Sequence, residues 1–245
     1  MKVVPCTSCP LRRLPLFLPQ AQGELALIES LKRDQALVRA DDSVIREGQT
    51  NAPLYTLLSG WAFRFKTLSD GRRQILNFLL PGDFIGVQQK MADASAHGVQ
   101  ALTDVVLCVF QRDALWELHR SAPKLGFSVT WLTAHEESVV DDALLSVGRR
   151  SAEERIATLL ILLYKRAAAL LPEGTSSGAP FPLTQQHIAD ALGLSLVHTN
   201  KTLRKLERRG LHRIADARLQ LLDVKTLARL ADLYGDGRPE PRPLI

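Results

Sequence analysis

Residues 183–211 read LTQQHIADALGLSLVHTNKTLRKLERRGL, and this stretch decides the fold of the C-terminal part of the chain. Thr184 and Ser195 are each placed to cap a helix, and Gly193 permits a tight turn between the two helices. The small and apolar positions that such a helix pair would bury are Ile188, Ala189, Leu192, Thr199, Leu203 and Leu206. The stretch therefore predicts a helix-turn-helix.

The face of the second helix opposite these buried positions is polar and basic, with the spacing of a helix that enters a DNA major groove. Asn200 is suited to read adenine, and Lys201 or Arg204 is suited to read guanine. After this helix, residues 211–214 and 219–222 flank a turn and predict a hairpin that forms a basic wing. The predicted DNA-contact residues are Thr184, Gln186, Ser195, Leu196, Val197, His198, Asn200, Lys201, Arg204, Lys205, Arg208, Arg213 and Arg218.

The net charge of +5 is unevenly distributed along the 245 residues. Residues 1–148 hold 15 basic and 16 acidic side chains, whereas residues 149–245 hold 16 and 10, giving −1 and +6. Residues 195–218 alone carry seven basic side chains against two acidic ones. Such a basic patch is what contacts with DNA phosphates require. Taken alone, the charge could also belong to a helix face that only contacts solvent.

Upstream, residues 35–110 contain short apolar runs separated by turn glycines at positions 48, 60, 71, 82 and 86, which predicts a compact antiparallel barrel or roll. The pair Asp70-Gly71 predicts a hairpin between two of these runs. No apolar run reaches membrane-spanning length and the N-terminus lacks a secretory pattern, so we expect no membrane association and a cytoplasmic location. Three cysteines are too few for a disulfide scaffold.

A long helix is expected from Pro123 to about Val147, because apolar positions recur there at alternating intervals of four and three. The recurring positions are Leu125, Val129, Leu132, Glu136, Val139 and Ala143. This stripe predicts a dimer interface. A second apolar row, formed by Val140, Leu144 and Val147, would then face the roll. The alternative is that the stripe packs on its own domain. Repulsion between two copies of Glu136 in the seam would then weaken the dimer, and Glu136→Leu would strengthen it.

The predicted fold class is α+β: an N-terminal antiparallel β-roll, a long dimerisation helix and a C-terminal winged helix-turn-helix. Five segments follow from this reading. They are a proline-rich leader with a CxxC motif (residues 1–22), a roll (23–121), the dimerisation helix (122–148), the winged helix-turn-helix domain (149–235) and a disordered tail (236–245).

This order of elements resembles the Crp/Fnr family of bacterial transcription regulators over nearly the whole chain. The motifs that carry the resemblance are Glu47-Gly48, Leu58-Ser59-Gly60, Asp70-Gly71, Leu80-Pro81-Gly82-Asp83-Phe84-Ile85-Gly86 and Leu192-Gly193-Leu194-Ser195. The resemblance implies a homodimer that presents two recognition helices to a roughly palindromic double-stranded operator, with a jelly roll like that of cyclic-nucleotide-binding proteins as the sensor. It also implies contact with RNA polymerase.

The chain departs from the cyclic-nucleotide-binding members of that family. They carry a Glu after the last Gly of the PGDFIG stretch and an Arg followed by a small hydroxyl residue downstream, where this chain has Val87 and Ser95-Ala96. A buried cyclic phosphate would lack its guanidinium partner. We therefore predict no binding of cyclic AMP.

Cys6, Cys9 and Cys108 resemble the Fnr branch, in which three leader cysteines and one roll cysteine hold a [4Fe–4S] cluster. The third leader cysteine falls at Pro15, which cannot bind iron, so His97, Asp104 or an outside ligand would complete the set. Reversible thiol oxidation and the absence of any cysteine-based sensing, with another signal or none, remain as alternatives. Val197 stands where many members carry a cytosine-reading Glu, so the operator sequence does not carry over from the family.

Enzymatic readings are disfavoured, because the chain lacks a P-loop, a GxGxxG motif and a complete zincin motif. The remaining competitor to a DNA-binding regulator is a module whose basic helix binds an acidic protein.

Overall fold

The structure is a computed structural model, and it describes residues 3–90, 94–172, 178–233 and 240–245. The chain divides into two compact units. The first unit contains Met1–Lys66, Phe78–Ser138 and Glu240–Ile245, and the second contains Thr67–Asn77 and Val139–Pro239. The first unit therefore takes up the end of the chain as well as its beginning.

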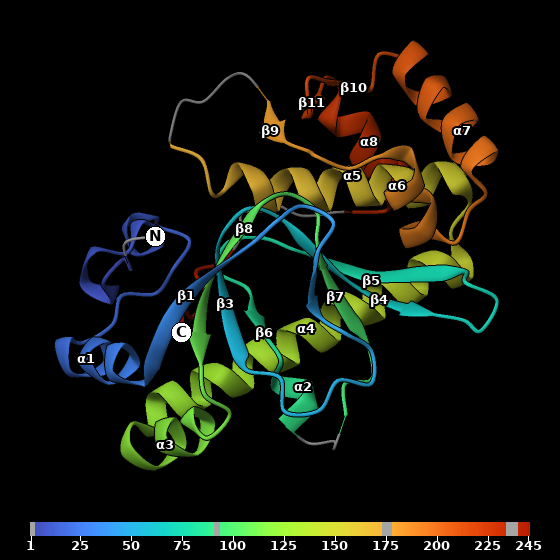
Figure 1. The fold of residues 1–245 in the computed structure, drawn as a ribbon. Coiled ribbons are helices and arrows are strands. Elements are labelled where there is room, and N and C mark those ends of the chain that lie inside the picture. Colours follow the sequence, from blue (N-terminus) through green and yellow to red (C-terminus); the bar gives the residue numbers. More distant parts are fainter. Residues whose placement is uncertain (1–2, 91–93, 173–177, 234–239) are drawn as a thin grey trace. The chain divides into compact units, whose positions relative to one another are not determined.

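Two four-stranded sheets form the roll of the first unit, in the orders β1-β8-β3-β6 and β2-β7-β4-β5 (Figure 1). The strands are β1 Lys32–Val38, β2 Ser43–Ile45, β3 Leu54–Ser59, β4 Ala62–Thr67, β5 Arg73–Leu79, β6 Phe84–Ile85, β7 Gly98–Ala101 and β8 Val105–Phe110. Leu57 and Leu107 lie opposite each other on β3 and β8 and belong to an apolar core drawn from both sheets. The predicted antiparallel roll is confirmed, and Gly71 takes a positive φ of 86° in the turn after Asp70.

The outer face of the β1-β8-β3-β6 sheet, which we call the outer sheet face, is covered by helices and by the leader. These elements are η1 Cys6–Ser8, η2 Pro10–Arg13, α1 Gln22–Leu31, α3 Ala114–Ser121 and α4 Pro123–Arg149; a short helix, α2 Val87–Lys90, follows β6. Leu54 and Phe110 on the sheet share one apolar cluster with Ile28 of α1 and Leu118 of α3. The first unit thus has one core inside the roll and another on this face.

The first half of the apolar stripe of α4 packs on this second core, as the alternative to a dimer seam predicted, whereas Val139 and Ala143 farther along the stripe are half-buried. Leu125, Val129 and Leu132 are at most 5% exposed and contact the outer sheet face cluster. An apolar sheet face must be covered, and the stripe covers it within the same chain. Among large apolar residues of α4, those left exposed are instead Phe127, Leu144 and Leu145.

Glu136 of α4 pairs with a cation of its own unit. Its Oε2 lies 2.6 Å from Nη1 of Arg64 on β4, and the two side chains are only 14% and 10% exposed. Because Arg64 offsets the charge of this carboxylate, we expect the repulsion between two copies of Glu136 to be weaker than the sequence alone suggests.

His97, which precedes β7, is buried in the same unit at 4% exposure. Burial, followed by the positive charges of Arg64 and Lys66, lowers the pKa of His97 from 6.5 to about 4. Between these values the unfolded chain binds a proton that the folded chain does not, so stability is lost as the pH falls through this window. We expect the free energy of unfolding to decrease by up to about 3 kcal/mol from this group.

Urea unfolding of the wild type and His97→Gln at a series of pH values measures this contribution. The difference between the two proteins separates His97 from the carboxylates that titrate in the same range. Two parallel stability profiles would show that His97 does not contribute.

The end of the chain is ordered where it is described, which corrects the predicted disordered tail. Arg242, Leu244 and Ile245 are 9%, 1% and 4% exposed and pack in the first unit. The part of the predicted tail at 236–239 lies outside the described residues. Sequence composition did not reveal this packing, because a short segment with two prolines, Pro241 and Pro243, carries no helical or strand period.

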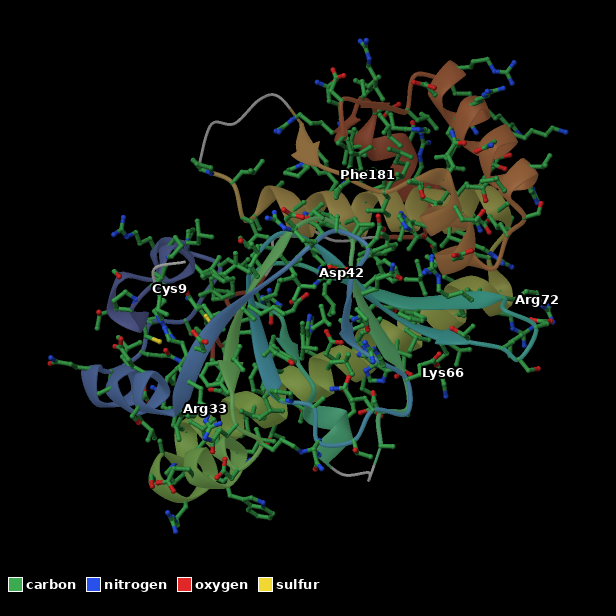
Figure 2. The ribbon with its side chains drawn as sticks, viewed as in Figure 1. Cys9, Arg33, Asp42, Lys66, Arg72 and Phe181 are labelled. Atoms are coloured by element: carbon green, nitrogen blue, oxygen red, sulfur yellow. The ribbon has the colours of Figure 1, made fainter. Side chains whose placement is uncertain are left out.

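The second unit contains the remaining helices and a small three-stranded sheet of order β10-β11-β9. Its elements are α5 Ala152–Ala168, β9 Ala179–Pro180, α6 Gln185–Leu192, α7 Leu196–Arg208, β10 His212–Ala215, β11 Arg218–Leu221 and α8 Val224–Leu230. Helix α5 begins at a capping box formed by Ser151 and Glu154, and it packs against α6, α7 and α8. Phe181, labelled in Figure 2, is 1% exposed in this core.

The tip of the β4–β5 hairpin belongs to this unit and is held on α6. The guanidinium of Arg73 lies 3.2 Å from a carboxylate oxygen of Asp190, and Gln74 donates to the carbonyl of Ala191 at 3.0 Å.

No helix within the described ranges is both long enough and apolar enough to cross a membrane.

Candidate nucleic-acid interface and cysteine site

Helices α6 and α7 form the predicted helix-turn-helix, with each predicted cap in place. The Thr184 hydroxyl accepts from the His187 amide at 3.2 Å, and the Ser195 hydroxyl accepts from the His198 amide at the same distance. Gly193 between the helices has a φ of 61°, a left-handed conformation that favours glycine. The turn residue and both caps were therefore readable from the sequence.

Helix α7 has a buried face and an exposed, basic face, as its sequence predicted. Thr199, Leu203 and Leu206 are at most 7% exposed, and Thr202 joins them. The side chains that project outward include Val197, which is 78% exposed, and the cations Lys201, Arg204 and Arg208. Asn200 is half-buried, and its amide oxygen has no partner among the described residues. The exposed face of α7 thus carries side chains of the types that contact DNA bases and phosphates in other proteins.

Some predicted DNA contacts are engaged within the protein instead. Lys205 forms an ion pair with Glu153 of α5, and Arg209 lies 3.0 Å from the same carboxylate. Gln186 donates to Asp190 at 2.6 Å. These bonds use one donor each of Lys205 and Gln186, so a phosphate contact from either side chain would have to use its remaining donors.

The wing forms as a hairpin between β10 and β11. Ala215 pairs with Arg218, and Asp216 and Ala217 both have positive φ, as a two-residue hairpin turn requires. Arg213 is exposed, whereas Arg218 is half-buried and donates to the carbonyl of Gly178. Arg213 is the wing cation better placed to reach a phosphate.

The three cysteines meet at one cavity on the outer sheet face. Cys6 and Cys9 come from the leader (Cys9 is labelled in Figure 2), Cys108 comes from β8, and all three are free thiols. The cavity they line has a volume of about 20 Å³, which is room for about one water molecule. The predicted set is thus brought together from positions far apart in the sequence.

Two cations and a row of polar side chains surround these thiols. The positive charge of Arg12 acts on all three thiols, and that of Lys32 acts on Cys6 and Cys108. Gln35 on β1 and Thr56 on β3 flank Cys108 in register, and the Gln35 amide nitrogen is 3.5 Å from the Cys108 sulfur. Sequence reasoning missed Arg12 and Lys32, which only the fold brings to the cysteines.

Burial raises the pKa of Cys6 and of Cys108 above the usual thiol value, and the nearby cations oppose this shift. Both groups are therefore protonated and weakly nucleophilic at neutral pH while the cavity is closed. A change that opens the cavity would remove the desolvation and make the same thiols more reactive.

The three cysteines are the right type of ligand for an iron–sulfur cluster, because thiolates are its usual ligands. Arg12 and Lys32 would offset the negative charge of such a cluster. The suggested fourth ligands do not line the cavity: His97 lies near Arg64, and Asp104 is exposed and pairs with Arg39 at 2.6 Å. Within the described residues, no three His, Cys, Asp or Glu side chains are arranged to hold a single metal ion. A cluster would also need more space than the closed cavity provides.

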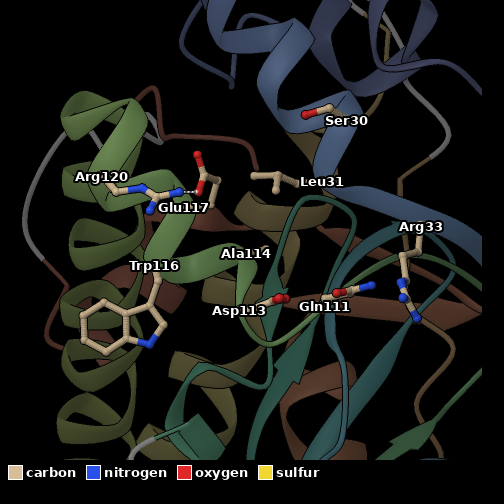
Figure 3. Close-up of a pocket in the computed structure, with 9 residues that line it drawn as sticks. All are labelled: Ser30, Leu31, Arg33, Gln111, Asp113, Ala114, Trp116, Glu117 and Arg120. Carbon is tan, nitrogen blue, oxygen red and sulfur yellow. Dashed lines mark hydrogen bonds and ion pairs between the residues drawn. The ribbon is translucent and has the colours of Figure 1, made fainter.

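A second and larger cavity, of about 600 Å³, lies between the end of α1 and α3 (Figure 3). Its lining mixes charges of both signs, including Arg33 and Asp113, and Glu117 pairs with Arg120. Trp116 on its edge is 70% exposed. This lining contains no cysteine or histidine and does not concentrate one charge, so it does not define a chemical site.

A roll followed by a long helix and a winged helix-turn-helix with a basic recognition helix defines a DNA-binding transcription regulator with a separate sensor-type domain. Comparison with family models agrees with this class. The cyclic nucleotide-binding domain model matches residues 36–122, and the Crp-like helix-turn-helix domain model matches residues 154–230.

Relatives narrow the class to a family. The chain is 31% identical over 233 residues to the transcriptional activator protein FnrL of Cereibacter sphaeroides, covering 94% of this chain and 92% of FnrL. It is 32% identical over 226 residues to the nitrogen fixation regulation protein FixK of Bradyrhizobium diazoefficiens, covering 92% and 93%. The chain belongs to the Crp/Fnr family of transcription regulators, and is accordingly a regulator rather than an enzyme.

The solved structure of FixK2 from Bradyrhizobium japonicum has the same fold. It superposes with a TM-score of 0.72 at 27% identity, covering 80% of this chain and 96% of FixK2. The predicted resemblance and fold class are thereby confirmed.

Proposed function

We propose that this regulator binds a specific double-stranded DNA operator as a homodimer and that Cys6, Cys9 and Cys108 make its activity depend on oxygen or redox state. The DNA-binding part rests on the outward face of α7, where Lys201, Arg204 and Arg208 project beside Asn200. The redox part rests on one observation, the convergence of all three cysteines on a single cavity.

Specific DNA binding is tested by gel shift with an operator selected from random duplexes. The affinity should decrease steeply as the salt concentration rises, because each phosphate contact releases counterions. The selected operator should be preferred over a scrambled duplex by at least a thousandfold. Equal affinity for both duplexes would favour the alternative of a basic module that binds an acidic protein.

The dimer would use the face of α4 that its own unit leaves uncovered. Leu144 and Leu145 are 70% and 50% exposed, and a second copy of the same helix face would bury them. We expect Leu144→Ser to weaken the dimer at least tenfold in sedimentation equilibrium, since each chain loses a large buried side chain. Leu125→Ala, on the buried stripe, should lower stability instead. Unchanged association in Leu144→Ser would exclude this interface.

The cysteines can sense redox state by holding an iron–sulfur cluster or by thiol oxidation. Protein prepared without oxygen distinguishes the two. A [4Fe–4S] cluster held by Cys6, Cys9 and Cys108 would supply an oxygen-sensitive inorganic centre, with Arg12 and Lys32 balancing its charge. Protein made and purified without oxygen should then be coloured and contain iron and sulfide. Colourless protein that stays free of both after reconstitution would leave thiol oxidation as the sensing chemistry.

Unchanged regulation in Cys6→Ser, Cys9→Ser protein would exclude both redox mechanisms and favour a different signal or none.

We further propose that cyclic AMP is not the signal, because Val87, Ser95 and Ala96 stand where cyclic-nucleotide-binding members carry charged and hydroxyl groups. Micromolar binding in calorimetry would contradict this. Contact with RNA polymerase and a cytoplasmic location follow from the family and complete the proposal.

A further inference from the structure

The last four residues of the chain, Arg242–Ile245, lie on the outer sheet face beside the cysteine cavity. Leu244 and Ile245 line that cavity together with Cys6, Cys9 and Cys108. Ile245 also belongs to the apolar cluster that contains Cys6 and Phe110. We call this segment the C-terminal strap.

Arg242 fixes the beginning of the strap. Its Nη1 lies 2.5 Å from Oδ1 of Asp83, and the two side chains are 11% and 2% exposed. Its backbone accepts from the Leu18 amide at 2.9 Å and donates to the Leu16 carbonyl at 2.8 Å, a parallel bridge to the leader. A buried ion pair of this kind is costly to break from one side. Arg242 therefore joins the leader to the turn that contains Asp83.

Phe17 and Gly82 leave little free space around this ion pair. The Arg242 guanidinium lies over the ring of Phe17, 5.3 Å from its centre. Gly82 has a φ of 93°, and a Cβ there would come within 2.3 Å of the Phe17 ring. The leader and strap thus pack against a backbone position that only glycine suits.

The end of the strap is held next to Cys108. Gln20 of the leader donates to the Leu244 carbonyl at 2.7 Å, and the Thr56 hydroxyl donates to the Ile245 carbonyl oxygen at 2.7 Å. Thr56 is the residue opposite Cys108 in the β3–β8 ladder. Side chains of such opposite pairs are neighbours on one face of a sheet. Ile245 therefore covers the sheet beside Cys108.

Because the cavity has room for only about one water molecule while the strap lines it, a larger occupant cannot enter without movement of its walls.

We propose that the C-terminal strap is a lid bound in its own site on the outer sheet face, and that access of oxidant or metal to Cys6 and Cys108 requires its release. The proposal rests on the geometry of the cavity and strap, and it holds whichever redox chemistry the cysteines perform.

The test is the alkylation rate of each cysteine by iodoacetamide, followed by mass spectrometry in reduced, metal-free protein. A chain that ends at Pro241 should react at least tenfold faster than the full chain at Cys6 and Cys108, and less so at the half-buried Cys9. Glu240→Ala, an exposed change in the same segment, is the matched control and should react as the wild type does.

A peptide added in trans makes the test specific to the strap. The hexapeptide of residues 240–245 should restore protection to the shortened chain, whereas the same peptide with Arg242→Ala should protect at least tenfold less well. If the shortened chain fails to fold, as judged by circular dichroism, Leu244→Ala, Ile245→Ala protein keeps the ion pair and is compared in its place. Equal alkylation rates in the folded variant and the wild type, or no protection by the peptide, would overturn the proposal.

Discussion

Replacing Lys201 and Arg204 together with alanine is expected to weaken specific DNA binding by at least a hundredfold while leaving the fold intact. Both side chains are exposed on α7, so their removal costs no internal packing. A single base or phosphate contact contributes about 1–3 kcal/mol. Two contacts in each of two recognition helices contribute about 4 kcal/mol even at the low end, which corresponds to nearly a thousandfold in affinity. Gel-shift titration on the selected operator measures the loss.

The matched control removes the same charge from another helix of the same unit. Lys225 and Arg229 are exposed on α8, and their double replacement with alanine should change the affinity less than about fivefold through long-range electrostatics. Comparable losses in the two double variants would mean that net charge, rather than the α7 face, carries DNA binding.

Glu136→Leu is expected to destabilise the protein by about 3–5 kcal/mol, because it leaves the guanidinium of Arg64 buried without its counter-charge. The Arg64 side chain is only 10% exposed, so water cannot fully replace the carboxylate. Urea unfolding at neutral pH measures the change as a lower midpoint at an unchanged slope.

The compensating variant is Arg64→Met, Glu136→Leu, in which both charges are absent. Replacing a whole buried pair by apolar side chains is often nearly neutral, so the double variant should recover most of the lost stability. If Glu136→Leu instead strengthens association in sedimentation and leaves stability unchanged, Glu136 lies in a dimer seam after all.

The elements that sequence predicted best are those with strong local signals. The caps at Thr184 and Ser195, and the turn glycine Gly193, each act within a few residues and appear in the structure as predicted. What the apolar side of α4 packs against could not be predicted from local signals. Its period shows that one side is apolar, but whether Leu125 and Val129 meet a sheet of the same chain or a second copy depends on tertiary packing.

At the cysteine site, too, the sequence predicted some residues and missed others. The CxxC spacing and Cys108 indicated a shared site, and the structure brings the three thiols to one cavity. The partners that control this site, Arg12 and the C-terminal strap, carry no motif. Arg242 and Asp83 are 159 residues apart in the sequence, and no local pattern encodes their contact.

The most direct test of the redox-responsive regulator is the dissociation constant for the selected operator, measured without oxygen and again after exposure to air. The account predicts a change of at least tenfold in the wild type and no change in the Cys6→Ser, Cys9→Ser variant. The same dissociation constant for the wild type in both conditions would contradict the account, because the cysteine cavity would then have no influence on DNA binding.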